Sequence, residues 1–211
     1  MEQIQSLQTK AQRLLACIAE EITSHSRARS SGEQVTRDKA LRLLQDLGVT
    51  LETTISPEQS GVTWDGEVLF VRGLTASDLL HELAHFQCAP ATAYGLPDFG
   101  LGLGSKGNLK AACQRYSVER VAEAPWEKRS VRGVDEEISA SFLGILWERW
   151  LGAPFWNALV ADGWGGIDEK DQWAWGDPSS WQCAADLMEL GLINTTGKPN
   201  LVLRDGRRLL G

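Results

Sequence analysis

The segment His81-Glu82-Leu83-Ala84-His85 constrains this chain most, because it is an H-E-x-x-H motif in a stretch with helical character. Two histidines four positions apart lie one above the other on one face of an α-helix, so their imidazole nitrogens can converge on one metal ion. The glutamate between them points to the flank of that site, where a carboxylate can hold or deprotonate a metal-bound water. The motif therefore predicts two metal ligands, His81 and His85, and one catalytic residue, Glu82.

The residues on either side of the motif delimit a short helix. Thr75-Ala76-Ser77-Asp78 is a capping-box pattern at its start, and Pro90 limits how far it can run. One face should pack into a core through Leu79, Leu80, Leu83 and Phe86. The other face carries His81, Ala84, His85 and Cys88. Cys88 could approach a metal, but we interpret it as a small buried apolar group. The alternative to a metal site is an amphipathic helix with two hydrogen-bonded surface histidines.

A metal site of this kind needs a third protein ligand, and the chain has only three histidines. The third, His25, falls in the polar stretch 25–34, which is typical of a solvated loop. The remaining candidates are acidic: Asp98, Glu136 and Glu137. Glu137 is preferred over Glu136, because its helix face carries small residues that allow a second helix to approach closely. These residues are Ala140, Ser141 and Gly144. The alternative for both glutamates is a pair of acidic groups favoured by the helix dipole.

Length, composition and charge set the class of protein. A chain of 211 residues with 43% hydrophobic and 23% charged residues is expected to fold as one globular domain with a substantial core. Its net charge of −7 argues against a general nucleic-acid binder, but it suits a basic protein partner. No stretch resembles a membrane span or a signal peptide, and the four scattered cysteines indicate no disulfide framework. These features predict a cytoplasmic protein.

Hydrophobic periodicity and turn signals predict the order of the elements. Helices are expected at residues 3–24, 109–124, 135–150 and 179–192, with a further helix that Thr36 caps and Gly48 ends. Strands are expected at 49–55, 61–64 and 67–72, with a hairpin turn at Asp65-Gly66 and a terminal hairpin at 201–207. We therefore predict an α+β fold in which a small antiparallel sheet precedes the H-E-x-x-H helix and the C-terminal half is mostly helical.

This order, a sheet and then a metal helix, is typical of zincin-type metal hydrolases. The whole chain, residues 1–211, is expected to form one metal-dependent catalytic domain. N-terminal helices should occupy residues 1–48, the metal-site core 49–160, and a tryptophan-rich part 161–211.

A longer run of residues surrounds the motif. A strand, a glycine and an Ala-Ser pair in residues 67–77 lead into it, and Asp98-Phe99-Gly100 follows it. Gly152-Ala153-Pro154-Phe155 comes later. This arrangement, over roughly residues 65–160, resembles the elongation factor P hydroxylase family, in which Glu137 matches a later acidic position. The resemblance implies a zincin-like fold, hydroxylation of a modified lysine on a translation factor, and a metal held as in non-haem iron oxygenases.

The residues themselves allow two reactions at one divalent metal ion. With Zn²⁺, an open position would hold a water that Glu82 activates for peptide hydrolysis. With Fe²⁺, the same two histidines and one carboxylate leave room for dioxygen. We expect a hydroxylase that acts on a protein side chain, with elongation factor P as its partner and Asp98 in the substrate pocket. A zinc metallopeptidase is the alternative. A binding module without turnover is least favoured, because Glu82 is present.

Overall fold

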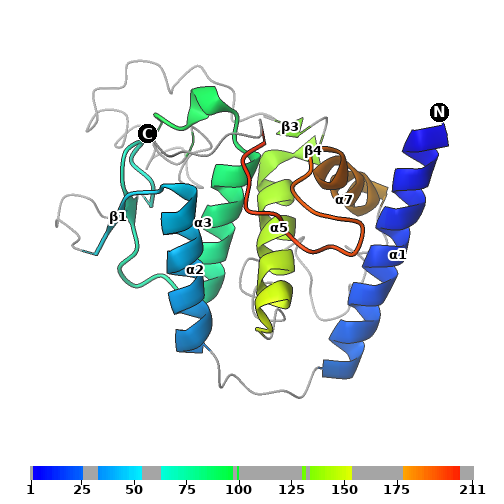
Figure 1. Ribbon diagram of the computed structural model, residues 1–211, viewed down its shortest axis with the longest axis horizontal. Helices are drawn as coiled ribbons and strands as arrows, with labels where there is room; N and C mark the ends of the chain where they lie inside the picture. The colour runs from blue at the N-terminus through cyan, green and yellow to red at the C-terminus, as the bar shows by residue number, and fades with distance from the viewer. Residues whose placement is uncertain are drawn as a thin grey trace, which may run out of the picture.

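The computed structural model describes residues 2–25, 33–53, 63–96, 99, 130–131, 134–153 and 178–204 (Figure 1). In chain order these form α1 (Glu2–His25), α2 (Glu33–Leu47), β1 (Leu51–Glu52), β2 (Leu69–Phe70), α3 (Ala76–Cys88), the 3-10 helix η2 (Ala91–Ala93), β3 (Ser130–Val131), β4 (Val134–Asp135), α5 (Glu136–Leu151) and α7 (Pro178–Glu189). The described residues are thus rich in helix and contain two short strand pairs, which agrees with the predicted α+β class. None of the described helices is long and apolar enough to cross a membrane.

Helix α3 lies between α2 and α5, and α1 packs on α7 at the other side of the molecule (Figure 1). The neighbouring helices α3 and α5 run in opposite directions (Figure 1). One cluster of buried apolar side chains joins these helices. The four side chains predicted to face a core from the motif helix are all fully buried, namely Leu79, Leu80, Leu83 and Phe86. The core therefore holds the motif helix at its centre.

Both ends of α3 are where the sequence places them. Thr75 and Asp78 form a capping box, in which the Thr75 hydroxyl accepts from the backbone N–H of Asp78 at 3.2 Å and the Asp78 carboxylate accepts from the N–H of Thr75 at 2.7 Å. The helix ends at Cys88 because Ala89, which precedes Pro90, is extended. These local signals fix the two ends of the helix that carries both motif histidines.

The last turn of α3 is buried, so its carbonyl groups need partners outside the helix. The carbonyl of Phe86 accepts from the Tyr94 hydroxyl at 3.0 Å, and that of Gln87 accepts from the backbone N–H of Arg204 at 2.9 Å. Two segments far apart in the chain, after η2 and after α7, therefore complete one helix terminus.

The sheet beside α3 is mixed, and the prediction of an antiparallel sheet was wrong for its main pair. Strands β1 and β2 are parallel, with Leu51 opposite Leu69. The antiparallel part is a single bridge between Trp64 and Leu69. The chain reverses at the Asp65-Gly66 turn, and β2, the second arm of this hairpin, inserts between Trp64 and β1. As the central element, β2 is therefore parallel to β1 on one side and antiparallel to the segment of Trp64 on the other.

The predicted hairpin turn itself is confirmed. The Asp65 carboxylate accepts from the backbone N–H groups of Glu67 at 2.8 Å and Val68 at 2.7 Å, as an Asx turn does. Gly66 has φ +104°, and a Cβ there would lie 2.8 Å from the carbonyl oxygen of Gly95. This turn therefore requires glycine for its backbone angle and for its contact with the segment after η2.

Several other predicted boundaries need correction. Helix α1 extends to His25, so this residue ends a helix and does not lie in a loop. Thr36 is buried inside α2, which begins at Glu33, and so it is not the helix cap. Of the predicted terminal hairpin, residues 201–204 form no strand, and 205–207 lie outside the described residues. The predicted helix at 109–124 lies outside them as well.

An antiparallel bridge does form earlier, between Ile193 and Pro199. The Asn194 side chain closes its turn by accepting from the N–H groups of Thr196 and Lys198, both at 2.9 Å. The turn signal that was missed is therefore an Asx turn centred on Asn194.

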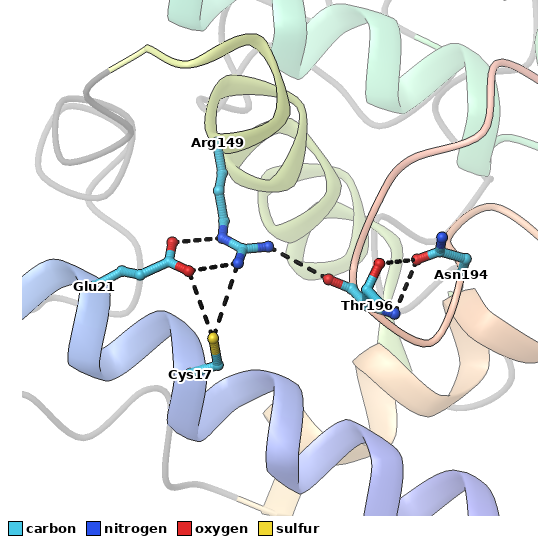
Figure 2. A network of polar contacts seen from close by, with 5 residues as sticks. All are labelled: Cys17, Glu21, Arg149, Asn194 and Thr196. Carbon is cyan, nitrogen blue, oxygen red and sulfur yellow. Dashed lines mark hydrogen bonds and ion pairs between the residues drawn. The ribbon is translucent and has the colours of Figure 1, made fainter.

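An ion pair connects α1, α5 and this turn (Figure 2). The Arg149 guanidinium donates through Nε to one oxygen of Glu21 at 2.6 Å and through Nη2 to the other. Its Nη1 reaches the carbonyl of Thr196 at 3.4 Å, and the thiol of Cys17 lies beside the pair. A bidentate pair of this kind fixes the direction as well as the distance between two helices.

Candidate metal centre

The two histidines of the motif meet at their ring nitrogens. His81 Nε2 and His85 Nε2 are at hydrogen-bonding distance, 2.8 Å apart, with ring centroids 4.5 Å apart and ring planes at 83°. Two nitrogens that each lie about 2.1 Å from one ion, at an angle of about 90–110°, are roughly 3.0–3.4 Å apart. A small adjustment therefore places both nitrogens on one metal ion, so this pair fits a divalent metal.

Helix α5 approaches α3 most closely at His81. A Cβ on Gly144 would lie 3.3 Å from the Cα of His81 and 3.4 Å from the carbonyl oxygen of Leu80. Ser141, one turn earlier, places its hydroxyl 3.4 Å from His81 Nδ1. The close approach predicted from the small residues of α5 is confirmed. Ser141 also has a role that its size did not indicate, because a hydroxyl beside Nδ1 orients the ring from its second nitrogen.

An aromatic cluster covers the other histidine. The ring of Phe99 stacks on His85 with centroids 5.6 Å apart and planes at 19°. Phe99 also contacts Trp64 and Phe86. The sequence pattern singled out Asp98 in the Asp98-Phe99-Gly100 run, whereas the described contact to the motif comes from its neighbour Phe99.

Of the acidic residues predicted for the site, only Glu82 has a side chain among those that the structure describes. Glu82 follows His81 on α3 and is half-buried. Glu136 and Glu137 are the first two residues of α5, but their side chains lie outside what the structure describes. Asp98 lies outside the described residues altogether. Among the described side chains, no group of three His, Cys, Asp or Glu residues is arranged to hold a metal ion. The third ligand therefore stays a prediction.

Two of the three cysteines in the described segments are buried in the core, and Cys17 is exposed on α1. Cys88 is fully buried in the core, which agrees with its interpretation as a small apolar group. Cys183 is also buried, and its thiol donates to the Ser139 hydroxyl at 3.7 Å. Cys17, Cys88 and Cys183 form no disulfide with one another.

Comparison of the chain with protein-family models, with curated proteins and with solved structures found no match. The function must therefore be argued from the geometry of the site and from the sequence pattern around it.

Proposed function

We propose that this chain is a metal-dependent hydroxylase that acts on a protein side chain, with a zincin-like metal helix. The observation that carries the proposal is the Nε2-to-Nε2 distance of 2.8 Å between His81 and His85. These side chains come from a capped helix whose opposite face is buried, so the pair is held by the core of the molecule. Preorganised ligands of this kind favour metal binding, because little ordering remains to be done.

We assign the third ligand to Glu137. It lies seven residues before Gly144, the point at which α5 meets His81, and seven residues return to the same face of a helix. Because α3 and α5 run in opposite directions, the path from Gly144 back to Glu137 follows the path from His81 to His85. The face of α5 that carries Gly144 and Glu137 therefore follows the face of α3 that carries the histidines. Glu136 lies on a different face of α5.

The residues of the chain have separate roles in this proposal. His81, His85 and Glu137 hold the metal, which supplies open positions for dioxygen if it is iron or a polarised water if it is zinc. Glu82 accepts or delivers a proton from the flank of the site. The aromatic cluster around Phe99 keeps water from one side of His85, whose side chain is buried.

The choice of reaction rests on the sequence pattern. The run from the strand at 67–72 through the motif to Asp98-Phe99-Gly100 resembles the elongation factor P hydroxylases, and Asp98 is our candidate for the substrate pocket. A net charge of −7 suits a basic side chain on the partner protein. The second candidate, a zinc metallopeptidase, is favoured by Glu82, which stands where the general base of such enzymes stands.

One experiment separates the candidates. The protein is purified without oxygen and its metal content is measured. The mass of intact elongation factor P, from cells with and without this gene, is then measured by mass spectrometry. A mass gain of one oxygen that depends on His85 supports the hydroxylase. Cleavage of casein, stopped by a chelator and restored by zinc, assigns the peptidase instead.

The ligand set has its own test. We expect about one metal ion per chain, lost in His81→Ala and in Glu137→Ala but kept in Glu136→Ala. Metal content that is unchanged in His81→Ala would reject the site. Loss in Glu136→Ala alone would transfer the third ligand to Glu136.

A further inference from the structure

Phe99 has a backbone conformation that a bulky side chain rarely adopts. Its φ is +55°, and it is the only non-glycine residue with a positive φ among the described residues. A large aromatic residue in the left-handed region is strained unless its surroundings hold it there. The backbone N–H of Phe99 donates to the carbonyl of Leu96 at 3.0 Å, and the side chain is fully buried. The packing and hydrogen bonds of the surrounding residues must therefore compensate the backbone strain at Phe99.

The ring of Phe99 is held by two other aromatic side chains. It packs edge-on against Phe86, with centroids 4.7 Å apart and planes at 90°, and lies nearly parallel to Trp64 at 5.9 Å. Trp64 and Phe86 contact each other at 4.8 Å. The three rings form a closed triangle, in which each ring contacts the other two.

This triangle is tied to the protein backbone. The indole N–H of Trp64 donates to the carbonyl of Tyr94 at 2.8 Å, and the Tyr94 hydroxyl donates to the carbonyl of Phe86 at 3.0 Å. The hairpin, the segment after η2 and the last turn of α3 therefore form one frame around Phe99. A frame of buried hydrogen bonds and packed rings leaves a side chain little freedom.

We infer that Phe99 is a positioning residue of the candidate metal centre, whose ring fixes the plane of the His85 imidazole. The torsion that turns an imidazole on its Cβ is intrinsically broad, so a ligand histidine needs an external contact to aim its nitrogen. The face of Phe99 lies against His85 at 5.6 Å and 19°, which sets that torsion while Nε2 points at His81. For His81 the corresponding contact is Ser141, from α5.

The first test uses the metal-free protein and does not depend on the proposed function. The chain has three histidines, so its imidazole proton resonances can be assigned by comparison with His81→Ala and His85→Ala. Stacking predicts nuclear Overhauser contacts between the rings of Phe99 and His85, and an upfield shift of the His85 ring protons. Phe99→Tyr should keep the shift and Phe99→Leu should lose it. Absence of the contacts in the unsubstituted protein would overturn the inference, even if Phe99→Leu does not fold.

The second test measures metal affinity and rests on the proposed function. Phe99→Leu should raise the dissociation constant for Co²⁺ or Zn²⁺ about 10–100-fold, the usual effect of losing the support of a ligand histidine. It should also change the visible absorption of the Co²⁺ form. Phe99→Tyr should bind as the unsubstituted protein does.

The matched control is Phe70→Leu, the same substitution at a buried position of β2. It should leave the affinity unchanged. Equal affinity of Phe99→Leu and the unsubstituted protein would overturn the inference and leave the proposed function intact. If the unsubstituted protein binds no metal, the proposed function fails, and the resonance measurements still decide whether Phe99 orients His85.

Discussion

Gln87 uses every hydrogen-bonding group of its side chain. Its amide donates to the carbonyls of Asn200 at 2.7 Å and Val202 at 2.9 Å, and its oxygen accepts from the indole N–H of Trp147 at 2.7 Å. The side chain is fully buried. A buried amide with all partners in place rigidifies its surroundings, because each lost bond would leave an unsatisfied group away from water. One residue thereby joins α3 to α5 and to the segment after α7.

We expect Gln87→Leu to lower the free energy of unfolding by about 3–5 kcal/mol, since it removes the partners of two carbonyls and one indole N–H at once. Urea denaturation followed by circular dichroism measures the change. Gln45→Leu, at an exposed position of α2, is the control and should change stability by less than about 0.5 kcal/mol. Equal behaviour of the two variants would show that the three bonds contribute little.

Glu82 is predicted to act in the reaction and not to bind the metal. Glu82→Gln keeps the size of the side chain and removes its charge. We expect the metal content to stay near that of the unsubstituted protein and the turnover to fall about a hundredfold or more, the scale of a lost general acid or base. Elemental analysis and a product assay on the same sample make the comparison. Full activity of this variant would remove Glu82 from the mechanism under either reaction.

At the scale of elements, the crossing of α3 and α5 depends on one glycine. A methyl group at position 144 would already press on the backbone of His81 and Leu80, and helix backbones yield little. Gly144→Val should therefore be less stable than Gly144→Ala by about 1–3 kcal/mol. Its metal affinity should fall as well, because the stripe of α5 that leads to Glu137 moves away from the histidines. Thermal unfolding and metal titration of both variants test this. Equal stability of the two variants would contradict it.

The buried thiol of Cys183, between α5 and α7, should make the protein less stable at alkaline pH. Burial raises the pKa of Cys183 from 9.0 to about 12. Below pH 9 the thiol is protonated in both states and has no effect. Between pH 9 and pH 12 the unfolded chain loses the proton while the folded chain keeps it, so the free energy of unfolding falls, by an amount on the order of 4 kcal/mol when complete.

Cys183→Ala should remove this part of the pH dependence, and Cys17→Ala, at an exposed thiol, should retain it. Urea denaturation of the three proteins between pH 8 and pH 11 provides the measurement. An unchanged slope in Cys183→Ala would assign the alkaline loss to other groups.

The elements that the sequence predicted well are those with local signals. Thr75 and Asp78 mark the start of α3, Pro90 marks its end, and apolar periodicity predicts α5 to within one residue. The parallel pairing of β1 with β2 was missed because it joins strands separated by a hairpin, and no short pattern encodes that insertion. The Asx turn at Asn194 was not predicted, because the Asp-Gly pair at residues 205–206 is the stronger hairpin signal in the sequence.

The candidate site divides in the same way. Helical spacing alone predicts the meeting of His81 and His85, and the small residues of α5 predict its close approach. The three side-chain partners of Gln87 lie 60, 113 and 115 positions further along the chain, so their contact depends on the complete fold. The stacking of Phe99 on His85 likewise needs a backbone conformation that the sequence argues against. The third ligand stays a prediction from helix geometry.

At the scale of the whole molecule, the ion pair of Arg149 with Glu21 links α5 to α1 (Figure 2). The Glu21 carboxylate raises the pKa of Arg149, mainly through its hydrogen bond, which is the direction expected for a stabilising pair. The side chains are 23% and 31% exposed, so solvent screens the attraction. A double-mutant cycle of Arg149→Met and Glu21→Gln should give a coupling of about 1 kcal/mol that shrinks in high salt. A coupling energy near zero in low salt would show that apolar packing, and not the ion pair, holds α1 in place.

Synthesis on the ribosome gives the link between Gln87 and residues 200–204 a further consequence. The motif helix emerges early, but the carbonyls that accept from the Gln87 side-chain N–H groups, and the N–H that donates to its backbone carbonyl, are made more than a hundred residues later. A nascent chain that stops after α5 therefore carries both histidines on a helix whose last turn still lacks its closing segment. Of the described segments, the one that completes the last turn of the histidine helix is therefore translated last.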